Sequence, residues 1–231
     1  MQDNEKLDAI LNRIKSTFDV NFEIMEVDNQ KLELLQIANM KKYLDNLLLT
    51  KKIRNPLKDL PLWAKIWPGS LVLGRFLRRF QKEDQSLLEI GAGMGATSLI
   101  ASSLGFKNIL ATDANDQAID FIEANILKNN LSASMRVQKL DISNDETGEK
   151  FDLIAASELL YLDNLHRPLI KFIDRRLAPG GKAVFCTDIA RLKPRFAKLA
   201  RQKFDVEEGH VGLKASDGER HIYNMLIVGK K

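Results

Sequence analysis

Three glycines at alternate positions follow an apolar run in the stretch LLEIGAGMGATSLIAS, residues 87–102. Glycines Gly91, Gly93 and Gly95, placed directly after a strand, would let a ligand approach bare backbone at the positive end of a helix. The relaxed dinucleotide pattern G-x-G-x-x-G/A also fits, as Gly91, Gly93 and Ala96. The glycines therefore predict a nucleotide-type ligand without deciding which one.

Two carboxylates beside these glycines narrow the choice. Asp113 ends the next apolar run, NILATDAN, where an acidic side chain can bind two ribose hydroxyls of either NAD or S-adenosylmethionine (SAM). Glu89 favours SAM, because a carboxylate would repel a pyrophosphate and attract an ammonium and a sulfonium. The remaining chain, residues 96–231, is too short for the additional catalytic domain of most dehydrogenases. Two structural roles stay open: Glu89 as a strand-end charge and Asp113 as a helix N-cap.

Apolar strand-like runs alternate regularly with amphipathic segments from residue 61 onward, which predicts an α/β fold. The pattern is typical of a doubly wound parallel sheet with helices on both faces, whose ligands bind beyond the carboxyl ends of the strands. The expected strands are 87–91, 109–112, 134–139, 152–157, 182–187, 204–211 and 220–229. The expected helices are 94–104, 116–129, 164–177 and 195–203, with another that has Pro68 just inside its start.

The first 60 residues follow a different plan. Apolar residues at helical spacing predict a helix over 3–15, and alternation over 18–24 followed by an Asp-Asn turn predicts a hairpin. Asn39 is a candidate N-cap for a helix beginning at residue 40, and 50–61 resembles a connecting loop. We therefore expect an N-terminal extension, 1–60, and one larger domain, 61–231.

Composition excludes several classes of protein. With 45% hydrophobic and 29% charged residues, the chain resembles an ordinary soluble globular protein, and neither a signal peptide nor a membrane span is evident. A cytoplasmic location is expected. Cys186 is the only cysteine and reads as a core residue, and the three histidines lie far apart, so no metal site is expected.

Five ordered segments carry a family resemblance: LEIGAGMG, ATDAN, LDIS, FDLIAASELLY and LAPGGKAVF. Their order and spacing resemble those of the class I, seven-β-strand SAM-dependent methyltransferases, over roughly residues 60–231. The resemblance implies a Rossmann-like seven-stranded sheet with an antiparallel last strand, SAM as cofactor and S-adenosylhomocysteine as product. Two further pieces, PLWAKIWPGSLVLGRFL and ELLY, resemble the Trp-containing helix and the D/E-x-x-Y motif of the protein-lysine methyltransferase branch.

The same resemblance implies the cofactor-binding residues. They are Trp67, Glu89, Gly91, Ala92, Gly93, Asp113, Asp141, Ile142 and Ser157. Trp67 would border the methionine end of SAM, Asp141 would meet the adenine amino group and Ile142 would pack on the adenine ring. Many lysine-methylating relatives have Trp at the position of Ile142, yet an aliphatic side chain also covers a ring. A purely structural role, packing against the core, stays open for Trp63 and Trp67.

Glu158 and Tyr161, in ELLY, are the candidate catalytic residues. Methyl transfer from a sulfonium needs alignment of the acceptor and removal of one proton when the acceptor is an ammonium, so no covalent nucleophile is required. Glu158 could hold a lysine ammonium, and the Tyr161 ring could flank it. Each also has a possible structural role, as a helix N-terminal charge for Glu158 and as a packing residue for Tyr161.

The acceptor is not named by the sequence. A protein substrate is expected, because enzymes that methylate base amines commonly have N/D-P-P-Y/F where this chain has SELLY. The segment 166–204 keeps nucleic acid open, since it holds 11 Lys or Arg against Asp174 and Asp188. Arg191, Arg195 and Lys198 would lie on one side of its last helix, as a solvated face or as a surface for an acidic partner or RNA. The same motifs are also compatible with a small-molecule N- or O-methyltransferase and with a non-catalytic SAM-binding module.

Overall fold

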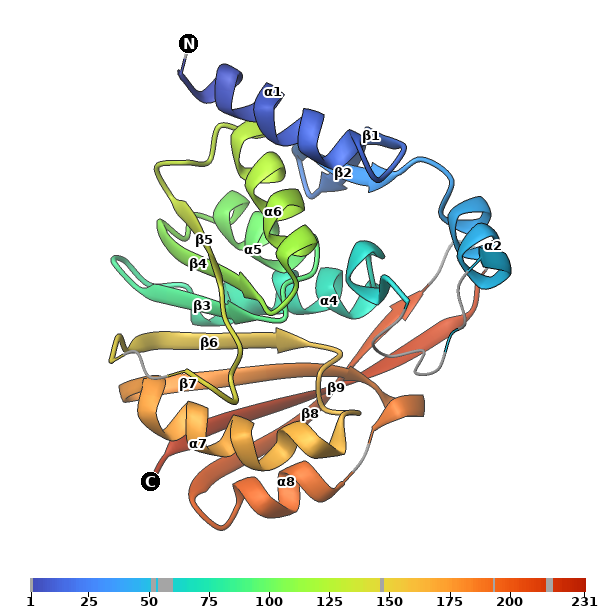
Figure 1. Cartoon of the computed structure of the whole chain (residues 1–231). Helices are drawn as coiled ribbons and strands as arrows, with labels where there is room; N and C mark the ends of the chain where they lie inside the picture. Colours follow the sequence, from blue (N-terminus) through green and yellow to red (C-terminus); the bar gives the residue numbers. More distant parts are fainter. Residues whose placement is uncertain (1, 51–52, 54–59, 146–147, 193, 215–217) are drawn as a thin grey trace.

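A seven-stranded sheet in the order β5-β4-β3-β6-β7-β9-β8 organises the chain (Figure 1). The computed structural model describes residues 2–50, 53, 60–145, 148–192, 194–214 and 218–231. The strands are β3 (Ser86–Ile90), β4 (Asn108–Asp113), β5 (Met135–Lys139), β6 (Phe151–Ser157), β7 (Leu177–Asp188), β8 (Phe204–Lys214) and β9 (Arg220–Lys230). The first five of these in chain order pair in parallel, whereas β9 runs antiparallel to both β7 and β8. The expected fold class is confirmed.

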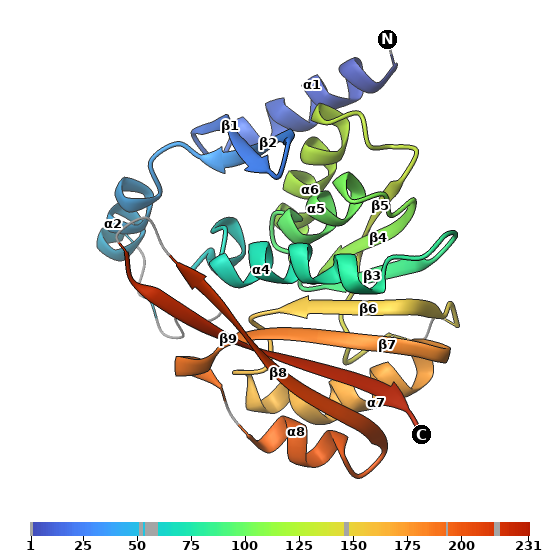
Figure 2. The same cartoon turned by 180° about the vertical axis from the view of Figure 1, so that it is seen from behind.

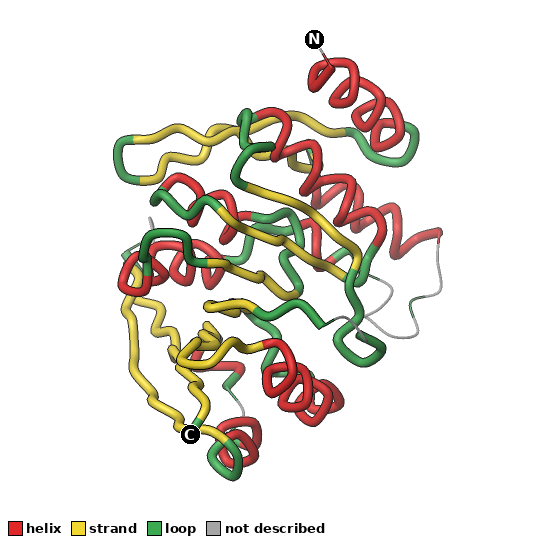
Figure 3. Tube along the Cα trace, turned by 90° about the vertical axis from the view of Figure 1, so that its left-hand side faces the viewer, coloured by secondary structure: helices red, strands yellow, loops and turns green. Residues whose placement is uncertain are grey.

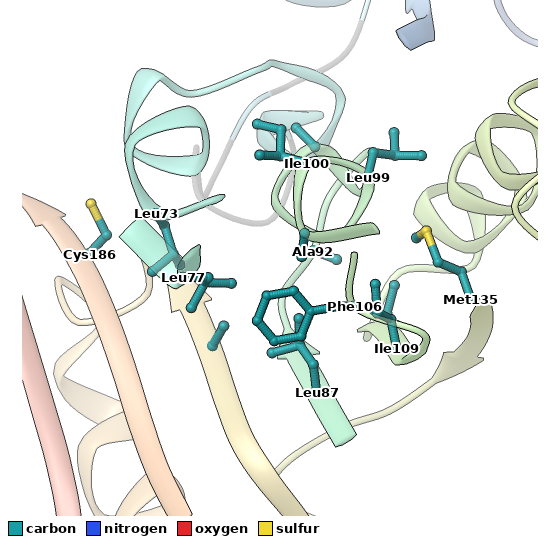
Figure 4. Packing of buried hydrophobic residues seen from close by; sticks show 14 of the residues in the cluster. Leu73, Leu77, Leu87, Ala92, Leu99, Ile100, Phe106, Ile109, Met135 and Cys186 are labelled. Carbon is teal, nitrogen blue, oxygen red and sulfur yellow. The ribbon is translucent and has the colours of Figure 1, made fainter. Parts of the chain in front are cut away.

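Helices cover both faces of the sheet (Figures 1 and 2). Alternation along β3 explains the two layers: Leu87 packs with α4 (Pro68–Phe76), α5 (Ala96–Ser103) and α6 (Asp116–Lys128), and Leu88 packs with α7 (His166–Arg176) and α8 (Arg195–Ala200). Figure 4 shows the first cluster, where Leu87, Phe106 and Ile109 lie beneath Ile100. Within the described part of the chain, no helix combines the length and apolar character needed to cross a membrane.

Local sequence signals explain where the helices near the glycines begin. Pro68 occupies the first turn of α4, as expected, and Trp67 lies just outside the helix as its N-cap residue. The N-cap of α6 is Asn115, whose side chain accepts hydrogen bonds from the backbone N–H groups of residues 117 and 118. The interpretation of Asp113 as that cap is therefore wrong, and its carboxylate is engaged elsewhere.

The N-terminal extension forms the expected helix, hairpin and helix: α1 (Gln2–Lys15), β1 (Val20–Val27), β2 (Gln30–Ile37) and α2 (Met40–Thr50). Asn39 accepts a hydrogen bond from the Lys42 N–H at 2.9 Å, as predicted for an N-cap. The hairpin is separate from the large sheet (Figure 3) and lies against α6. In the expected connecting loop, 50–61, residues 51–52 and 54–59 lie outside the described residues.

Two sets of contacts connect this extension to the glycine loop. Buried Asn125 on α6 accepts a hydrogen bond from the Leu35 N–H at 2.7 Å and donates one to the Met94 carbonyl at 2.9 Å. The rings of Phe18, Trp63 and Phe121 pack edge to face, with centroids 5.1–5.9 Å apart. Trp63 therefore has the packing role that the sequence left open for it.

A buried ion pair anchors the segment that follows β5. Both oxygens of Asp145 accept hydrogen bonds from Arg176 Nη1 of α7, at 3.1 and 3.0 Å, and both side chains are almost fully buried. The guanidinium also lies 5.4 Å from the ring centre of Phe151. Since Asp141 and Ile142 belong to the same segment, this pair fixes one end of the stretch that carries them.

We expect Asp145→Ala to lower the free energy of unfolding by about 3–5 kcal/mol, because Arg176 would remain as a buried charge without its partner. The double variant Asp145→Leu/Arg176→Met removes both charges and should lie within about 1–2 kcal/mol of the wild type. Urea unfolding of the three proteins measures both differences. A cost below about 1 kcal/mol for Asp145→Ala would show that the pair does not stabilise this segment.

Candidate functional site

A cavity of about 730 Å³ opens at the carboxyl ends of the parallel strands. Residues 60–67, which precede α4, contribute to its lining. Every residue proposed from the sequence lines it. The residues assigned to the cofactor are Trp67, Glu89, Gly91, Ala92, Gly93, Asp113, Asp141, Ile142 and Ser157, and those assigned to catalysis are Glu158 and Tyr161. Residues that are 94 positions apart in the chain thus meet in one site.

Gly93 shows why the loop after β3 requires glycine. Its φ angle is +58°, in the left-handed region. A Cβ atom built on it would also lie 2.7 Å from the carbonyl oxygen of Trp63, a backbone atom that cannot move aside alone. The backbone around Trp63 therefore lies directly against the glycine loop, and both segments line the cavity.

Asp113 closes this loop from the neighbouring strand. Its Oδ2 accepts a hydrogen bond from the Gly93 N–H and its Oδ1 accepts one from the Asn115 N–H, both at 2.9 Å. Burial raises the pKa of Asp113, and these backbone hydrogen bonds oppose that change. Each carboxylate oxygen keeps a lone pair for a further donor, so ribose binding by Asp113 stays a prediction.

Glu89 is 2% exposed and makes its hydrogen bonds inside the protein. Its Oε2 accepts hydrogen bonds from the N–H and the hydroxyl of Ser98, in the first turn of α5. Burial raises the pKa of Glu89 to about 7, against the hydrogen bonds from Ser98 and Thr97, which lower it. The carboxylate therefore ties β3 to α5, and an additional contact with a cofactor ammonium stays a prediction.

Glu158 lies immediately after β6 in a strained backbone conformation, with a φ angle of +52°. It is not at a helix N-terminus, since the next helical turn begins at Asp163, so the interpretation as a helix N-terminal charge is wrong. Oε1 accepts a hydrogen bond from the Asp188 N–H at 3.1 Å and pairs with Arg191 Nη2 at 3.0 Å. Burial raises the pKa of Glu158, while the nearby Arg191 charge lowers it.

Two buried oxygens at this point have no hydrogen-bond partner among the residues that the structure describes: Glu158 Oε2 and Ser157 Oγ. Gly69, in the first turn of α4, packs against the side chains of these two residues. A Cβ at Gly69 would lie 2.7 Å from Glu158 Oε1 and 2.9 Å from Ser157 Oγ. Unpaired buried acceptors are costly, so a donor is expected to reach them when the site is in use.

Trp67 lines the same cavity, and two cations lie near its ring. Its indole N–H donates to the Leu62 carbonyl at 3.0 Å, Lys65 Nζ lies 4.6 Å from the ring centre, and the Arg191 guanidinium carbon lies 5.0 Å from it. Tyr161 is half-buried in the cavity wall, and burial raises the pKa of its phenol. This corner of the cavity, formed by Trp67, Ser157, Glu158 and Tyr161, combines a carboxylate, a hydroxyl and aromatic surface. Together these groups can bind an organic cation.

Arg191 lines the cavity but lies in a different element from the one that the sequence predicts. Helical spacing places it on the last basic helix, but α8 spans only Arg195–Ala200, and Arg191 ends a separate turn, η4 (Ile189–Arg191). Three further basic residues of 166–204 form ion pairs: Arg176 with Asp145 inside the protein, Lys203 with Asp174 at 2.7 Å, and Arg201 with Glu208. Arg195 and Lys198 are exposed, and Lys193 lies outside the described residues.

The adenine end of the expected cofactor site is built on the segment after β5. Asp141 accepts hydrogen bonds from the Ser143 N–H at 2.9 Å and the Asn144 side chain at 2.8 Å, and Ile142 is buried against the sheet.

Cys186 lies in the core, where burial raises its pKa, as expected for an unreactive thiol. Among the residues with a described placement, no group of His, Cys, Asp and Glu side chains could hold a metal ion.

Comparison with known proteins identifies relatives of this chain. The family described as "Lysine methyltransferase" matches residues 50–200. The chain is 28% identical over 181 residues to the protein N-lysine methyltransferase METTL21A of Danio rerio, covering 73% of this chain and 79% of that relative. It is 33% identical over 155 residues to the ribosomal protein L11 methyltransferase of Lactobacillus johnsonii, covering 67% of this chain and only 45% of the longer relative. Further curated relatives are matched over 33–53% of their length.

The fold is also that of solved structures. The crystal structure of P. horikoshii TYW2 in complex with MeSAdo aligns with a TM-score of 0.61, covering 93% of this chain and 73% of that one. The sequence identity is 17%, so this similarity concerns the fold alone.

The raised pKa of Glu89 predicts a pH-dependent stability. Between about pH 4.5 and 7 the folded protein keeps the proton on Glu89 while the unfolded chain releases it, so the free energy of unfolding falls as the pH rises through this window. The loss attributable to Glu89 should be about 2–3 kcal/mol. Glu89→Gln should remove that part, because an amide does not titrate.

Urea unfolding of wild type and Glu89→Gln at pH 5 and pH 8, without cofactor, isolates this effect, since the remaining carboxylates are common to both proteins. Identical pH dependence in the two proteins would mean that Glu89 does not hold a proton in the folded state.

Proposed function

The chain belongs to the lysine methyltransferase family, and we propose that it transfers a methyl group from SAM to the side-chain nitrogen of a lysine in a protein. One observation carries the choice of acceptor. Glu158, with its free oxygen, lies beside the aromatic surface of Trp67 and Tyr161 in the same cavity as the glycine loop. A carboxylate with aromatic walls suits a lysine ammonium.

The residues present fit SAM in shape and in charge. The glycine loop provides bare backbone, Ile142 and its apolar neighbours provide a wall for a ring, and Asp113 provides a carboxylate for ribose hydroxyls. Acidic groups at the strand ends suit a ligand with an ammonium and a sulfonium. When bound, SAM supplies a methyl group already activated by its sulfonium and leaves as S-adenosylhomocysteine.

The protein's own residues must orient the acceptor and let it lose a proton. A lysine ammonium has a pKa near 10.4, so at neutral pH it arrives charged and Glu158 attracts it. The Tyr161 phenol, whose pKa is raised, stays protonated and is no base at neutral pH. We therefore assign the proton to water as the site closes, which means that activity should rise from neutral to mildly alkaline pH.

The division into an extension, 1–60, and a domain, 61–231, stays a prediction, as does action in the cytoplasm. A protein is the proposed partner. Nucleic acid stays the weaker alternative, since four of the basic residues of 166–204 are engaged in ion pairs: Arg176, Arg191, Arg201 and Lys203.

Incubating the purified protein with a cell lysate and methyl-labelled SAM tests the function. The label should appear on lysine side chains of the protein fraction, identified by mass spectrometry. Asp113→Ala serves as the cofactor-binding control and should lose incorporation together with affinity for S-adenosylhomocysteine. Label on RNA bases or on small molecules, with none on lysine, would replace the proposed acceptor by one of those classes, and cofactor binding without incorporation would indicate a non-catalytic module.

Glu158→Gln should keep its affinity for S-adenosylhomocysteine and lose about 10²-fold in methylation rate, because the amide cannot attract and orient the ammonium. Tyr161→Phe should cost much less than Tyr161→Ala if the ring, rather than the hydroxyl, borders the acceptor. Initial rates of methyl incorporation into lysate protein, with calorimetry of cofactor binding as the folding control, measure both effects. Full activity in Glu158→Gln would remove this residue from the mechanism and leave the enzyme class standing.

A further inference from the structure

The guanidinium of Arg191 lies beside Glu158 and Trp67, the two groups next to which the ammonium of the acceptor lysine would be expected. Its Nη2 is 3.0 Å from Glu158 Oε1 and 3.7 Å from Asp188 Oδ2, and its central carbon is 5.0 Å from the Trp67 ring centre. A carboxylate and an aromatic face are the groups that bind an organic cation, and here both already contact one. Arg191 therefore shares the surroundings of the acceptor nitrogen.

This arginine is held less firmly than the carboxylate it contacts. The Arg191 side chain is 34% exposed, whereas that of Glu158 is 6% exposed. Glu158 Oε1 also accepts the hydrogen bond from the Asp188 N–H, which would remain if Arg191 were replaced. Removing the arginine charge should consequently leave Glu158 in position, which makes the charge itself testable.

The charged and titratable groups around this corner come from five segments. They are Lys65 before α4, Glu158 and Tyr161 after β6, Cys186 and Asp188 on β7, Arg191 on η4 and Tyr223 on β9. Burial raises the pKa of the two tyrosines and the cysteine, so all three are neutral near pH 7. The net charge near the acceptor is therefore set by the carboxylates of Glu158 and Asp188 and by the cations of Arg191 and Lys65, both of which lie near the Trp67 ring.

Building on the proposed function, we propose that Arg191 is a positioning residue that favours the neutral amine of the acceptor over its ammonium. As a fixed positive charge between Glu158 and Trp67, it weakens binding of the ammonium and promotes release of its proton to water. The nitrogen lone pair then forms the N–C bond while the C–S bond of the cofactor breaks, and the electron pair of that bond stays on sulfur. The products are a methylammonium and a neutral thioether.

Binding of n-butylamine, charged at pH 7.5 and similar to a lysine side chain, tests the first half of this proposal. The S-adenosylhomocysteine complex is titrated in a Trp63→Phe background, where Trp67 is the single tryptophan and its fluorescence reports the site. Arg191→Gln should bind the amine about tenfold more tightly than the parent, since a competing positive charge is gone. Arg191→Lys should stay within about threefold, and n-butanol should show no difference.

The pH profile tests the second half. With lysate protein as acceptor, the midpoint of the rise in methylation rate should move up by about one pH unit in Arg191→Gln, so that the variant is slow at pH 7 and recovers at high pH. Arg191→Lys should keep the wild-type midpoint. Arg195→Gln, an exposed arginine nearby on α8, is the matched control and should match the wild type in both measurements.

Equal or weaker amine binding in Arg191→Gln, or a rate reduced by the same factor at every pH, would overturn the proposal. Arg191→Met, uncharged and of similar reach, should reproduce both changes if the glutamine variant loses cofactor binding. A wild type that methylates no lysine would refute the proposed function, whereas a lysine-methylating wild type with an unshifted Arg191→Gln profile would refute only the role of Arg191.

Discussion

Five carboxylates at one edge of the sheet, each hydrogen-bonded to backbone N–H groups, are the constraint on which the site depends. Each of the five parallel strands ends at or near one of them: Glu89, Asp113, Asp141, Glu158 and Asp188. The backbone donors belong to Ser98, to Gly93 and Asn115, to Ser143, to Asp188 and to Ala190 respectively. Glu89 and Glu158 are buried, and a carboxylate is buried at acceptable cost only when such donors satisfy it, so the loops must adopt the turns that supply them.

The same hydrogen bonds decide which ligand charge the edge can accept. At the carboxyl edge of a parallel sheet, the loop and helix N–H groups often bind an anionic phosphate. Here the N–H of Gly93, in the glycine loop, and that of Ser98, in the first turn of α5, are already donated to Asp113 and Glu89. Two backbone donors at this edge are therefore occupied, and the carboxyl groups there favour a cationic ligand over an anionic one. A cofactor with a sulfonium and an acceptor with an ammonium are complementary to this edge, which gives a structural reason for the preference inferred from Glu89.

The sequence could predict those features of the fold that depend on residues close together in the chain. Glycine spacing, the strand-end carboxylates and the Pro68 helix start are local patterns, and they located the sheet and its helices correctly. The residues assigned to the site line one cavity, and their binding roles stay predictions. The errors concern residues whose role depends on distant partners. Arg191 belongs to a three-residue turn without helical periodicity, and its contact with Glu158 spans 33 positions of the chain. The alternative role of Asp113 as the N-cap of α6 stayed open because Asp113 and Asn115 are both capping residue types, and only the hydrogen bond from the Gly93 N–H assigns Asp113 to the loop.

The extension contributes to this site through packing rather than through chemistry. Phe18 packs against Trp63, the Trp63 carbonyl limits the space at Gly93, and Asn125 links the Leu35 backbone to the Met94 carbonyl inside the glycine loop. A shift of the hairpin would therefore be transmitted to two adjacent backbone segments that line the cavity, the one around Trp63 and the glycine loop. α1 and the hairpin lie against α6, whereas Glu158 follows β6 and Arg191 lies on η4 after β7. The glycine loop is thus held by α6 and, through α6, by the extension, whereas Glu158 is held by the Asp188 N–H and by Arg191 on η4. A change of charge at Arg191 should therefore leave the glycine loop undisturbed.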